Sequence, residues 1–579
     1  CVAYVKGEPM KKSLLFEALP ADRIAAALKA VREGQDADTA SMPTVKAADW
    51  TAVKELPAPA GAVEWKAVAD NAPAAKGVLG KTPIPLTGKA ANVQRILFSR
   101  PDIGQAAVLV VPEAAGLSAR QQVRVERYDL TDGKHLGGAD LFAAEFPKEM
   151  PGRPQSTATL DADLSPDGAM IAVREPKTGK RIDVWSMAEG KHVVGWLPYE
   201  KEGDGRVHWF AFLDAKHLLT LGGVGKLTLW EIPECKALYT VAFVRDLPAL
   251  SAGRKYLAAF TGSNFEVLEA ATGERVGQLF RPNAQGAQAT AYSRDGRELA
   301  AVLTTAEGLR LVRWDAVTGA VKDEFAVSPG GNELEWCGPD HILFGSTLFD
   351  LKLKWPIALY TLPGLGRAAT TSPDGRYWFA AARNPNAPPL LSAQTLPDDA
   401  TRQLATQAAG GNAKVVLAPG MAVKVSVQGA APGADAEAYH RDIATRQNQH
   451  LQSLGFKIAA DAPLTLTLQI QPSRDTGQMR TYKEIGRLRQ NIDVHVIEVT
   501  VVATLTDAGG AVVWTQKNNS QPPVMASVNT AEGFQEGLNK VVWSMAAGWA
   551  GAAAPPSVLI RTGAGVEALP RSVMLTGDH

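Results

Sequence analysis

The residues of this chain that could carry chemistry do not combine into a catalytic motif. Gly80-Lys81-Thr82 has the composition of the end of a phosphate-binding loop. Such a loop needs a glycine five positions before Gly80, where the chain has Ala75, and a following helix, which Pro83 forbids. We therefore predict no nucleotide site there, and we interpret residues 222–226 as a hairpin turn.

Histidines and cysteines are arranged without a metal-binding or nucleophilic pattern. The nine histidines are scattered, no HExxH pair occurs, and His440 and His450 are not on adjacent turns of one helix. Cys1, Cys235 and Cys337 form no CxxC pair, and no GxSxG nucleophile motif is present. We predict that each histidine is a surface or turn residue. We also predict no catalytic, cofactor-binding or metal-binding residues and no cofactor.

Aspartate recurs in short motifs that are typical of tight turns. The motifs are RPDIG at 100–104, SPDG at 165–168, SRDG at 293–296, GPDH at 338–341 and SPDG at 372–375, with weaker versions LDAKH at 213–217 and SAGRK at 251–255. An aspartate in such a turn accepts hydrogen bonds from the local backbone. We therefore interpret these aspartates as structural rather than as metal ligands or catalytic acids.

Each turn motif is followed by an aromatic residue or Leu, a polar residue and usually a glycine turn. Trp185, Trp230 and Trp314 occupy this aromatic position. Because they recur at one position of the repeat, we predict that they pack in the core rather than line a ligand cage. The insertion at 142–153 and the loop at 199–209 depart from the repeat, so they are the better candidates for binding.

The turn motif and the aromatic position that follows it alternate with a period of about 40–45 residues. This is the length of a unit of four short strands. Strand-like runs bounded by Gly, Pro or Asp fall inside the periods. They are residues 94–98, 170–173, 217–221, 227–230, 299–303 and 309–314. Seven turn marks predict seven such units, with a margin of one because the last period is weak.

On these motifs, residues 92–408 resemble a bacterial WD-repeat β-propeller. Trp314-Asp315 is the one literal WD dipeptide, and most periods lack the Gly-His element of regular WD repeats. The divergent SPDG-marked repeats are similar to those of many bacterial propellers. The resemblance implies seven blades, give or take one, without the regular Asp-His-Ser/Thr-Trp hydrogen-bond network.

The chain after residue 411 changes its pattern. Alternating apolar residues at 421–427 and 464–470 predict two strands, and residues 434–454 predict a helix that stops at Gly455. Residues 492–506 predict a long strand with a β-bulge near Val496–Ile497, where the apolar phase changes. A hairpin turn at 507–510 and a strand at 511–516 follow.

A second helix is predicted near the end of this region. Asn529 and Glu532 have capping-box-like spacing. Its apolar stripe consists of Phe534, Leu538, Val541, Met545 and Trp549. One-sided strands and two amphipathic helices predict a two-layer α+β domain. The element order resembles small envelope-lipoprotein domains, including the one that accompanies the TolB propeller.

The predicted fold class is mainly β, a seven-bladed propeller followed by a smaller two-layer α+β domain. The predicted boundaries are an N-terminal arm at 1–90, the propeller at 91–410, the α+β domain at 411–562 and a C-terminal tail at 563–579. The arm contains a short helix at 22–33 and an Ala/Pro-rich stretch that favours an extended linker or a wrapping arm.

Two interpretations of Cys1 stay open. It is either the lipid-carrying cysteine of a mature bacterial lipoprotein or the edge of a fragment. No run of about 18 apolar residues exists, so we predict no transmembrane segment. The 60 Lys and Arg residues balance the 60 Asp and Glu residues, which argues against a nucleic-acid partner and against bulk-charge adhesion to a membrane.

These observations predict a non-catalytic interaction or scaffold protein rather than an enzyme. Its partner is expected to be a protein or a peptide, and its place a bacterial envelope assembly, in the cell envelope or periplasm rather than the cytoplasm. The alternative is an enzyme or small-ligand binder that uses the central channel of the propeller. That alternative requires polar and ionisable side chains from several blades to converge at one mouth of the channel.

Overall fold

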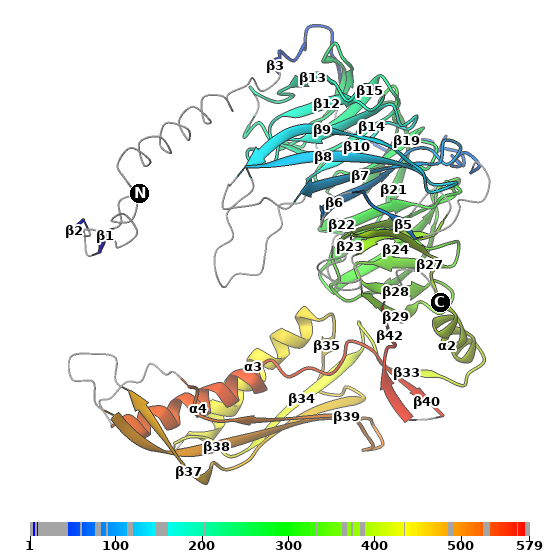
Figure 1. The fold of residues 1–579 in the computed structure, drawn as a ribbon. Helices are drawn as coiled ribbons and strands as arrows, with labels where there is room; N and C mark the ends of the chain where they lie inside the picture. Colours follow the sequence, from blue (N-terminus) through cyan, green and yellow to red (C-terminus); the bar gives the residue numbers. More distant parts are fainter. Residues whose placement is uncertain are drawn as a thin grey trace.

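The computed structural model of the chain is mainly β, with many small antiparallel sheets (Figure 1). The structure describes residues 4–5, 8–9, 45–57, 61–75, 83–87, 91–112, 120–145, 160–201, 203–242, 244–262, 264–281, 283–331, 333–361, 367–371, 375–381, 388–433, 435–483, 491–524, 533–563 and 565–573. β1 (Tyr4–Val5) and β2 (Glu8–Pro9) pair with each other. The helix predicted at 22–33 lies outside the described residues.

Seven consecutive small sheets dominate the described chain up to residue 394, and we number them along the sequence. Sheet 1 consists of β6 (Ala91–Phe98), β7 (Gln105–Pro112), β8 (Arg120–Asp129) and β9 (His135–Glu145). Sheet 2 consists of β10 (Ala162–Leu164), β11 (Met170–Arg174), β12 (Ile182–Ser186) and β13 (His192–Trp196). Sheet 3 consists of β14 (Val207–Phe212), β15 (His217–Gly222), β16 (Leu227–Glu231) and β17 (Lys236–Val241).

The remaining four sheets follow the same order of strands. Sheet 4 consists of β18 (Ala249–Leu250), β19 (Tyr256–Phe260), β20 (Asn264–Glu269) and β21 (Arg275–Phe280). Sheet 5 consists of β22 (Gly286–Tyr292), β23 (Glu298–Thr305), β24 (Gly308–Asp315) and β25 (Val321–Ala326). Sheet 6 consists of β26 (Leu334–Trp336), β27 (His341–Phe344), β28 (Thr347–Asp350) and β29 (Trp355–Thr361). Sheet 7 consists of β30 (Arg367–Thr371), β31 (Tyr377–Ala381), β32 (Leu390–Gln394) and β5 (Ile84–Pro85).

Neighbouring sheets pack face to face through apolar side chains. A separate hydrophobic cluster lies between each pair of consecutive sheets, and another lies between sheet 7 and sheet 1. The first strand of sheet 1, β6, contacts the first strands of both sheet 2 and sheet 7. All six strand-like runs predicted from the repeat are strands in the structure.

The N-terminal arm runs along the outer edges of the sheets. β3 (Val45–Lys46) adds in parallel to β13, and β4 (Lys54–Leu56) adds in parallel to β17. Further along, β5 pairs with β32 and completes sheet 7. The described part of the arm is therefore a wrapping arm, one of the two forms that its Ala/Pro-rich composition predicts.

A six-stranded sheet with two helices follows the seven small sheets in sequence (Figure 1). Its strands are β34 (Ala422–Gly429), β35 (Lys457–Ile458), β36 (Leu464–Ile470), β37 (Arg474–Lys483), β38 (Asn491–Thr506) and β39 (Val512–Ser520). The helices α3 (Ala436–Ser453) and α4 (Phe534–Ala550) pack on this sheet and on each other. The predicted phase change is present, because the buried residues of β38 shift phase between Val496 and Val499. The register shift that accompanies this phase change is in the neighbouring strand β37, where the residues between Asp475 and Met479 have no pairing partner in β38.

Two details of α4 differ from the sequence prediction. The helix begins at Phe534 with Gly533 as its N-cap and without a side-chain cap, and Asn529 and Glu532 lie outside the described residues. Its buried face contains Leu538, Val542, Ala546, Ala547 and Ala550, whereas Met545 is 43% exposed. The apolar stripe predicted for this helix contained only large side chains. Alanines let the helix approach the sheet closely, so they define the packed face instead.

Small elements attach this region to sheet 6. An unpredicted helix, α2 (Asp399–Ala409), contacts β29. A three-stranded sheet contains β33 (Lys414–Leu417), β40 (Leu559–Thr562) and β41 (Gly565–Ala568). Residues of α2, of this sheet and of sheet 6 share one hydrophobic cluster around Trp355. Within the predicted tail, β42 (Arg571–Val573) adds in parallel to β29.

Candidate functional site

A cavity of about 1210 Å³ lies where the first strands of the small sheets converge. Its acidic, basic and histidine lining residues come from four sheets. They are Arg95 on β6, Asp161 and Asp163 at β10, His208 on β14, and Glu333 and Glu335 at β26. The cavity is therefore polar on several sides, and it is the main candidate for a site within the described residues.

Asp161 joins two neighbouring sheets at this cavity. It pairs with Arg95 of sheet 1 at 3.5 Å and with Arg174 of its own sheet. Arg174 in turn donates to the backbone oxygen of Val207, the first residue of sheet 3. Three consecutive sheets are thus connected through one carboxylate and two guanidinium groups.

Asp163 makes a second connection of this kind. Its Oδ2 accepts a hydrogen bond from the backbone N–H of Phe212 in sheet 3 at 2.7 Å. The same oxygen lies 3.5 Å from Nη1 of Arg254 in the β18–β19 turn of sheet 4, and Arg254 also donates to the Phe212 oxygen. The charges near the cavity therefore have structural partners on adjacent sheets.

The sheet 6 side of the cavity is acidic. Glu333 is exposed and Glu335 half-buried, and both influence Tyr377 of sheet 7. Burial raises the pKa of Tyr377, and the charges of Glu335 and Glu333 raise it further. Two buried polar atoms of the lining, Arg95 Nε and Thr290 Oγ1, have no hydrogen-bond partner among the described protein atoms. Such a polar and roomy cavity can hold water or a polar ligand.

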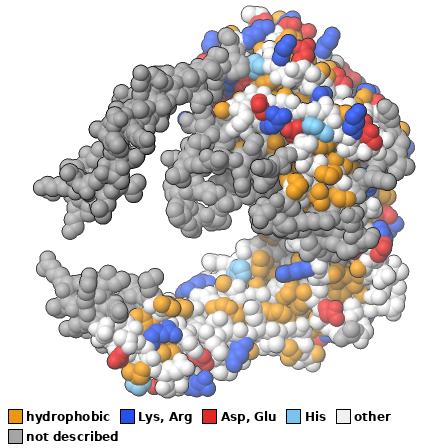
Figure 2. All heavy atoms as spheres, viewed as in Figure 1, with side chains coloured by type: hydrophobic (Ala, Val, Ile, Leu, Met, Phe, Trp, Pro, Cys, Tyr) orange, Lys and Arg blue, Asp and Glu red, His pale blue; other side chains and the backbone are white. Residues whose placement is uncertain are grey.

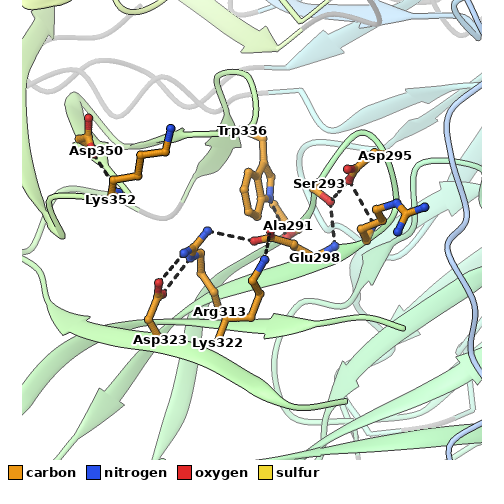
Figure 3. A network of polar contacts seen from close by, with 11 residues as sticks. Ala291, Ser293, Asp295, Glu298, Arg313, Lys322, Asp323, Trp336, Asp350 and Lys352 are labelled. Atoms are coloured by element: carbon orange, nitrogen blue, oxygen red, sulfur yellow. Dashed lines mark hydrogen bonds and ion pairs between the residues drawn. The ribbon is translucent and has the colours of Figure 1, made fainter. Parts of the chain in front are cut away.

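Three turn aspartates have the structural role that the sequence predicts, whereas the carboxylates of Asp102 and Asp340 bind the side chains of Arg100 and Lys352. Asp167 accepts hydrogen bonds from Ser165 Oγ at 2.6 Å and from the backbone of Ala169 at 3.0 Å. Asp295 repeats the pattern with Ser293 in sheet 5 (Figure 3). Asp214 accepts from two backbone N–H groups of its own turn. Asp374 lies outside the described residues.

The three recurring tryptophans lie in the core, as predicted. Trp185 is 2% exposed, and Trp230 and Trp314 are fully buried between neighbouring sheets. Trp230 donates from its indole N–H to Thr220 Oγ1 at 2.8 Å. Burial in the inter-sheet clusters and this hydrogen bond give the tryptophans a packing role.

The predicted binding loop at 199–209 divides into a structural part and a cavity-lining part. Tyr199 is 1% exposed, and its hydroxyl group lies 2.8 Å from Thr220 Oγ1 and 2.9 Å from the Lys226 oxygen. His208 and Trp209 line the cavity. In the insertion predicted at 142–153, Phe142 stacks on Trp185 at 5.5 Å, and residues 146–153 lie outside the described part of the chain.

The prediction that every histidine is a surface or turn residue is wrong for two of them, His192 and His341, which are partly buried, whereas His135 is exposed. All three stand at the beginning of strands and contact buried carboxylates of the same sheet. The pairs are His135 with Glu126 at 2.7 Å, His192 with Asp183 at 2.8 Å, and His341 with Asp350 at 3.6 Å. A buried carboxylate needs such a partner, so the histidines stabilise the fold.

The two internal cysteines are buried thiols without a catalytic partner in contact. Burial raises the pKa of Cys235 to about 12, and burial also raises the pKa of Cys337. A protonated buried thiol is a poor nucleophile. Among the described residues, no group of three His, Cys, Asp or Glu side chains could hold a metal ion.

Two further sequence predictions concern other parts of the chain. Gly222–Lys226 is a hairpin turn, closed by the Gly222 N–H to Lys226 oxygen bond of 2.9 Å. Gly80, Lys81 and Thr82 lie outside the described residues.

Within the described part of the chain, no helix has the length and apolar character that crossing a membrane requires. Positive and negative side chains are interspersed on the surface seen in Figure 2.

Sequence reasoning missed the charged residues of the cavity. Their signal was the alternation Asp161-Ala162-Asp163, which places two carboxylates on the same face of a short inner strand. This alternation is too short to predict a strand on its own, because β10 has only three residues. A comparison with protein-family models and with curated proteins finds no match for this chain.

Proposed function

We propose that the chain is a non-catalytic scaffold built on a seven-bladed β-propeller, with sheets 1–7 as the blades and β5 closing the last blade. The residues from β33 to β41 would form an accompanying α+β domain. The partner is a protein or a peptide, and the proposed setting is a bacterial envelope assembly.

The observation that carries this proposal is the use of charge at the cavity. Asp161 pairs with Arg95 of sheet 1 and with Arg174 of its own sheet, and Asp163 pairs with Arg254 of sheet 4. A catalytic acid or base must lie within hydrogen-bond reach of a substrate proton, and its pKa must lie near the working pH. Carboxylates held by guanidinium groups are instead suited to fixing the relative positions of the sheets, which is what a rigid binding platform needs.

The scaffold proposal is tested with the intact purified chain. We expect reciprocal capture of one specific protein partner, followed by reconstitution of the complex from two purified components with a 1:1 heat of binding. A matched assay with hydrolase and oxidoreductase substrate panels should show no turnover above a heat-denatured control. Turnover in that panel would overturn the proposal, and so would failure to reconstitute any captured complex.

A second candidate is a small-ligand site in the cavity, because acidic, basic and histidine side chains of four sheets converge there. Among the described residues, no arginine pairs with Glu333 as Arg95 and Arg174 pair with Asp161, so Glu333 is the residue to vary. A ligand of the cavity should raise the melting temperature of the wild type but not of Glu333→Gln. A ligand panel that shifts both proteins equally, or neither, removes this candidate.

A further inference from the structure

A β-bulge recurs in the first strands of alternate sheets. The pairing of the first strand with the second skips one residue in sheets 1, 3, 5 and 7, whereas it is continuous in sheets 2, 4 and 6. In sheets 1, 3 and 5 the skipped residue stands five positions before the residue whose backbone N–H closes the following hairpin. The three skipped residues, which we call the bulge residues, are Gln94, His208 and Gln288, and the closing residues are Ser99, Leu213 and Ser293.

Charged side chains of the neighbouring sheet hold two of these bulges in place. Asp246, which lies just before sheet 4, accepts a hydrogen bond at 2.6 Å from the backbone N–H of Ala287, the residue before the bulge of sheet 5. Arg174 of sheet 2 donates to the backbone oxygen of Val207, the residue before the bulge of sheet 3. Because a bulge turns a side chain in a new direction, these contacts fix the direction that the bulge residues take.

All three bulge residues line the cavity where the first strands converge. Gln94 is only 8% exposed and makes no hydrogen bond to another described residue. His208 and Gln288 are exposed and make none either. Beside them, Arg95 Nε and Thr290 Oγ1 are buried without a partner among the described protein atoms. Since a buried polar group without a hydrogen bond is costly, this lining needs partners from inside the cavity.

The groups that need partners are mostly neutral and can both donate and accept hydrogen bonds. A glutamine amide offers two donors and one acceptor, a neutral imidazole offers one of each, and the Thr290 hydroxyl offers both. The two aspartates of the lining are already paired with arginines. A sugar hydroxyl also donates and accepts at once, so it satisfies such a lining without bringing a charge into the cavity.

The placement of the bulge residues favours a compact ligand over an extended peptide. They come from sheets 1, 3 and 5, on different sides of the cavity, and do not form a row along one edge. A ligand that reaches all of them must carry polar groups around its whole outline, as a sugar ring does. Glu333 and Glu335 on the sheet 6 side repel anions and so favour an uncharged ligand. The cavity of about 1210 Å³ exceeds the roughly 300–1,000 Å³ of most ligand sites, so more than one sugar ring fits.

From these observations we infer that the cavity binds a neutral glycan, whose hydroxyl groups exchange hydrogen bonds with Gln94, His208 and Gln288. The half-buried Trp209 beside His208 adds apolar surface to the lining, against which the carbon face of a sugar ring can pack. The inference rests on the second candidate function, the small-ligand site, and names the class of its ligand.

The test begins with the full-length protein on an array that holds neutral glycans and glycans with uronate, sialate or phosphate groups. We expect binding to one or more neutral glycans and none to the anionic ones. Calorimetric titration with the best neutral glycan then gives the dissociation constant of the wild type and of variants. Gln288→Met and Gln94→Met each remove an amide but keep the length of the side chain, and each should weaken binding by about 5-fold or more.

Gln285→Met is the matched control for these variants. Gln285 is exposed, lies three residues before Gln288 and does not line the cavity, so its substitution should leave glycan binding unchanged. Circular dichroism and thermal melting of all three variants check that they fold.

Three results would overturn the inference: no bound glycan on the array, binding of anionic glycans alone, or equal affinity of the wild type and Gln288→Met for the glycan. The small-ligand candidate is judged separately by the melting shifts of the wild type and Glu333→Gln. A ligand other than a sugar that raises the melting temperature of the wild type alone keeps the cavity as a site and rejects the glycan. A neutral glycan that Gln288→Met binds more weakly supports both.

Discussion

Asp70 of the N-terminal arm accepts a hydrogen bond from Ser251 Oγ at 2.5 Å and so replaces a contact that other sheets make within their own turns. In sheet 2, Ser165 donates to Asp167 two residues later. In sheet 4 the aspartate position is Gly253, and a Cβ atom there would lie 2.1 Å from Asp70 Oδ1. The arm therefore supplies the carboxylate that this turn lacks, in the space that the glycine leaves open.

Replacing Asp70 by Ala should destabilise the chain and release this part of the arm. The Asp70 carboxylate also accepts the Lys255 N–H at 2.8 Å, so the substitution removes the acceptor of two donors. Loss of these bonds is expected to cost about 1–3 kcal/mol of unfolding free energy. Urea denaturation followed by tryptophan fluorescence measures the change, and faster proteolysis within residues 61–75 reports release of the arm.

A second substitution tests whether the turn of sheet 4 needs Asp70 itself or only a carboxylate at this place. Gly253→Asp alone should destabilise the protein, because the new side chain collides with Asp70 and adds a like charge. In the Asp70→Ala background the same change restores the local Ser-Asp turn, so the double variant should be more stable than either single one. Additive losses would show that Asp70 does not substitute for a turn aspartate.

The contrast between these two turns shows what the sequence can predict. Asp167 and its partner Ser165 are close in sequence, so turn chemistry alone predicts their contact. Asp70 and Ser251 are 181 residues apart, and the only local trace of their contact is the glycine in SAGRK. Period and composition predict strands and a wrapping arm, but the sequence does not tell which arm residue reaches which sheet.

The candidate site also combines local features that the sequence predicts with long-range contacts that it does not predict. Strands such as β16 are predictable because their apolar runs are long and local, and so is the burial of Trp230. The pairing of Asp161 with Arg95 joins two sheets, and it depends on how they pack rather than on any motif. The histidine partners of buried carboxylates were missed for a similar reason, since His192 meets Asp183 only through the strand register.

Trp50 of the arm should protect Cys235 from alkylation. Its ring lies 4.9 Å from the Trp230 ring, and the adjacent Asp49 N–H donates to the Cys235 oxygen at 2.9 Å. Burial raises the pKa of Cys235 to about 12, so this thiol stays protonated and slow to react at pH 8 in the wild type. Trp50→Ala should undock the arm and accelerate labelling of Cys235 by about 10-fold or more through local opening.

Cys337 is the internal control for this labelling experiment. It is 2% exposed in the core between sheets 6 and 7, far from the arm at Trp50 in sequence and on other sheets. Mass spectrometry after a short iodoacetamide pulse should therefore show a change at Cys235 alone. Equal acceleration at both thiols would mean global destabilisation, and unchanged labelling at Cys235 would mean that the arm does not cover it.

Asp350 should make part of the stability of the chain dependent on acid pH. Burial raises the pKa of Asp350, but the His341 side chain 3.6 Å away and the hydrogen bond from the backbone N–H of Leu353 outweigh burial and lower the pKa below its usual value. A carboxyl group with a lowered pKa in the folded state stabilises the fold above its unfolded pKa, and this contribution is lost as pH falls through the folded pKa.

The Asp350→Asn variant tests this dependence. Its unfolding free energy should be lower than that of the wild type at pH 6, and the difference should shrink as the pH falls from about 4 toward 2. Urea unfolding at several pH values measures both. The exposed Asp399, changed to Asn, is the control and should run parallel to the wild type. A difference between Asp350→Asn and the wild type that stays constant with pH would contradict the prediction.

Tyr199→Phe decides whether the beginning of the loop at 199–209 belongs to the fold or to a binding surface. The hydroxyl group of Tyr199 lies 2.9 Å from the backbone oxygens of both Thr220 and Lys226, deep in sheet 3. Its loss removes a buried donor from these oxygens, although the Gly222 N–H still binds the Lys226 oxygen, so we expect a decrease of about 0.5–1.5 kcal/mol in unfolding free energy.

The control for Tyr199 is Tyr292→Phe. Tyr292 lies in the cluster between sheets 4 and 5, and its hydroxyl group makes no hydrogen bond to another described residue. This change should cost less than about 0.5 kcal/mol, as is usual away from polar networks. If both variants unfold at the same urea concentration, the Tyr199 bonds add nothing to stability and the whole loop returns to the set of binding candidates. If only Tyr199→Phe is weakened, binding at this loop is confined to its second half, where His208 and Trp209 face the cavity.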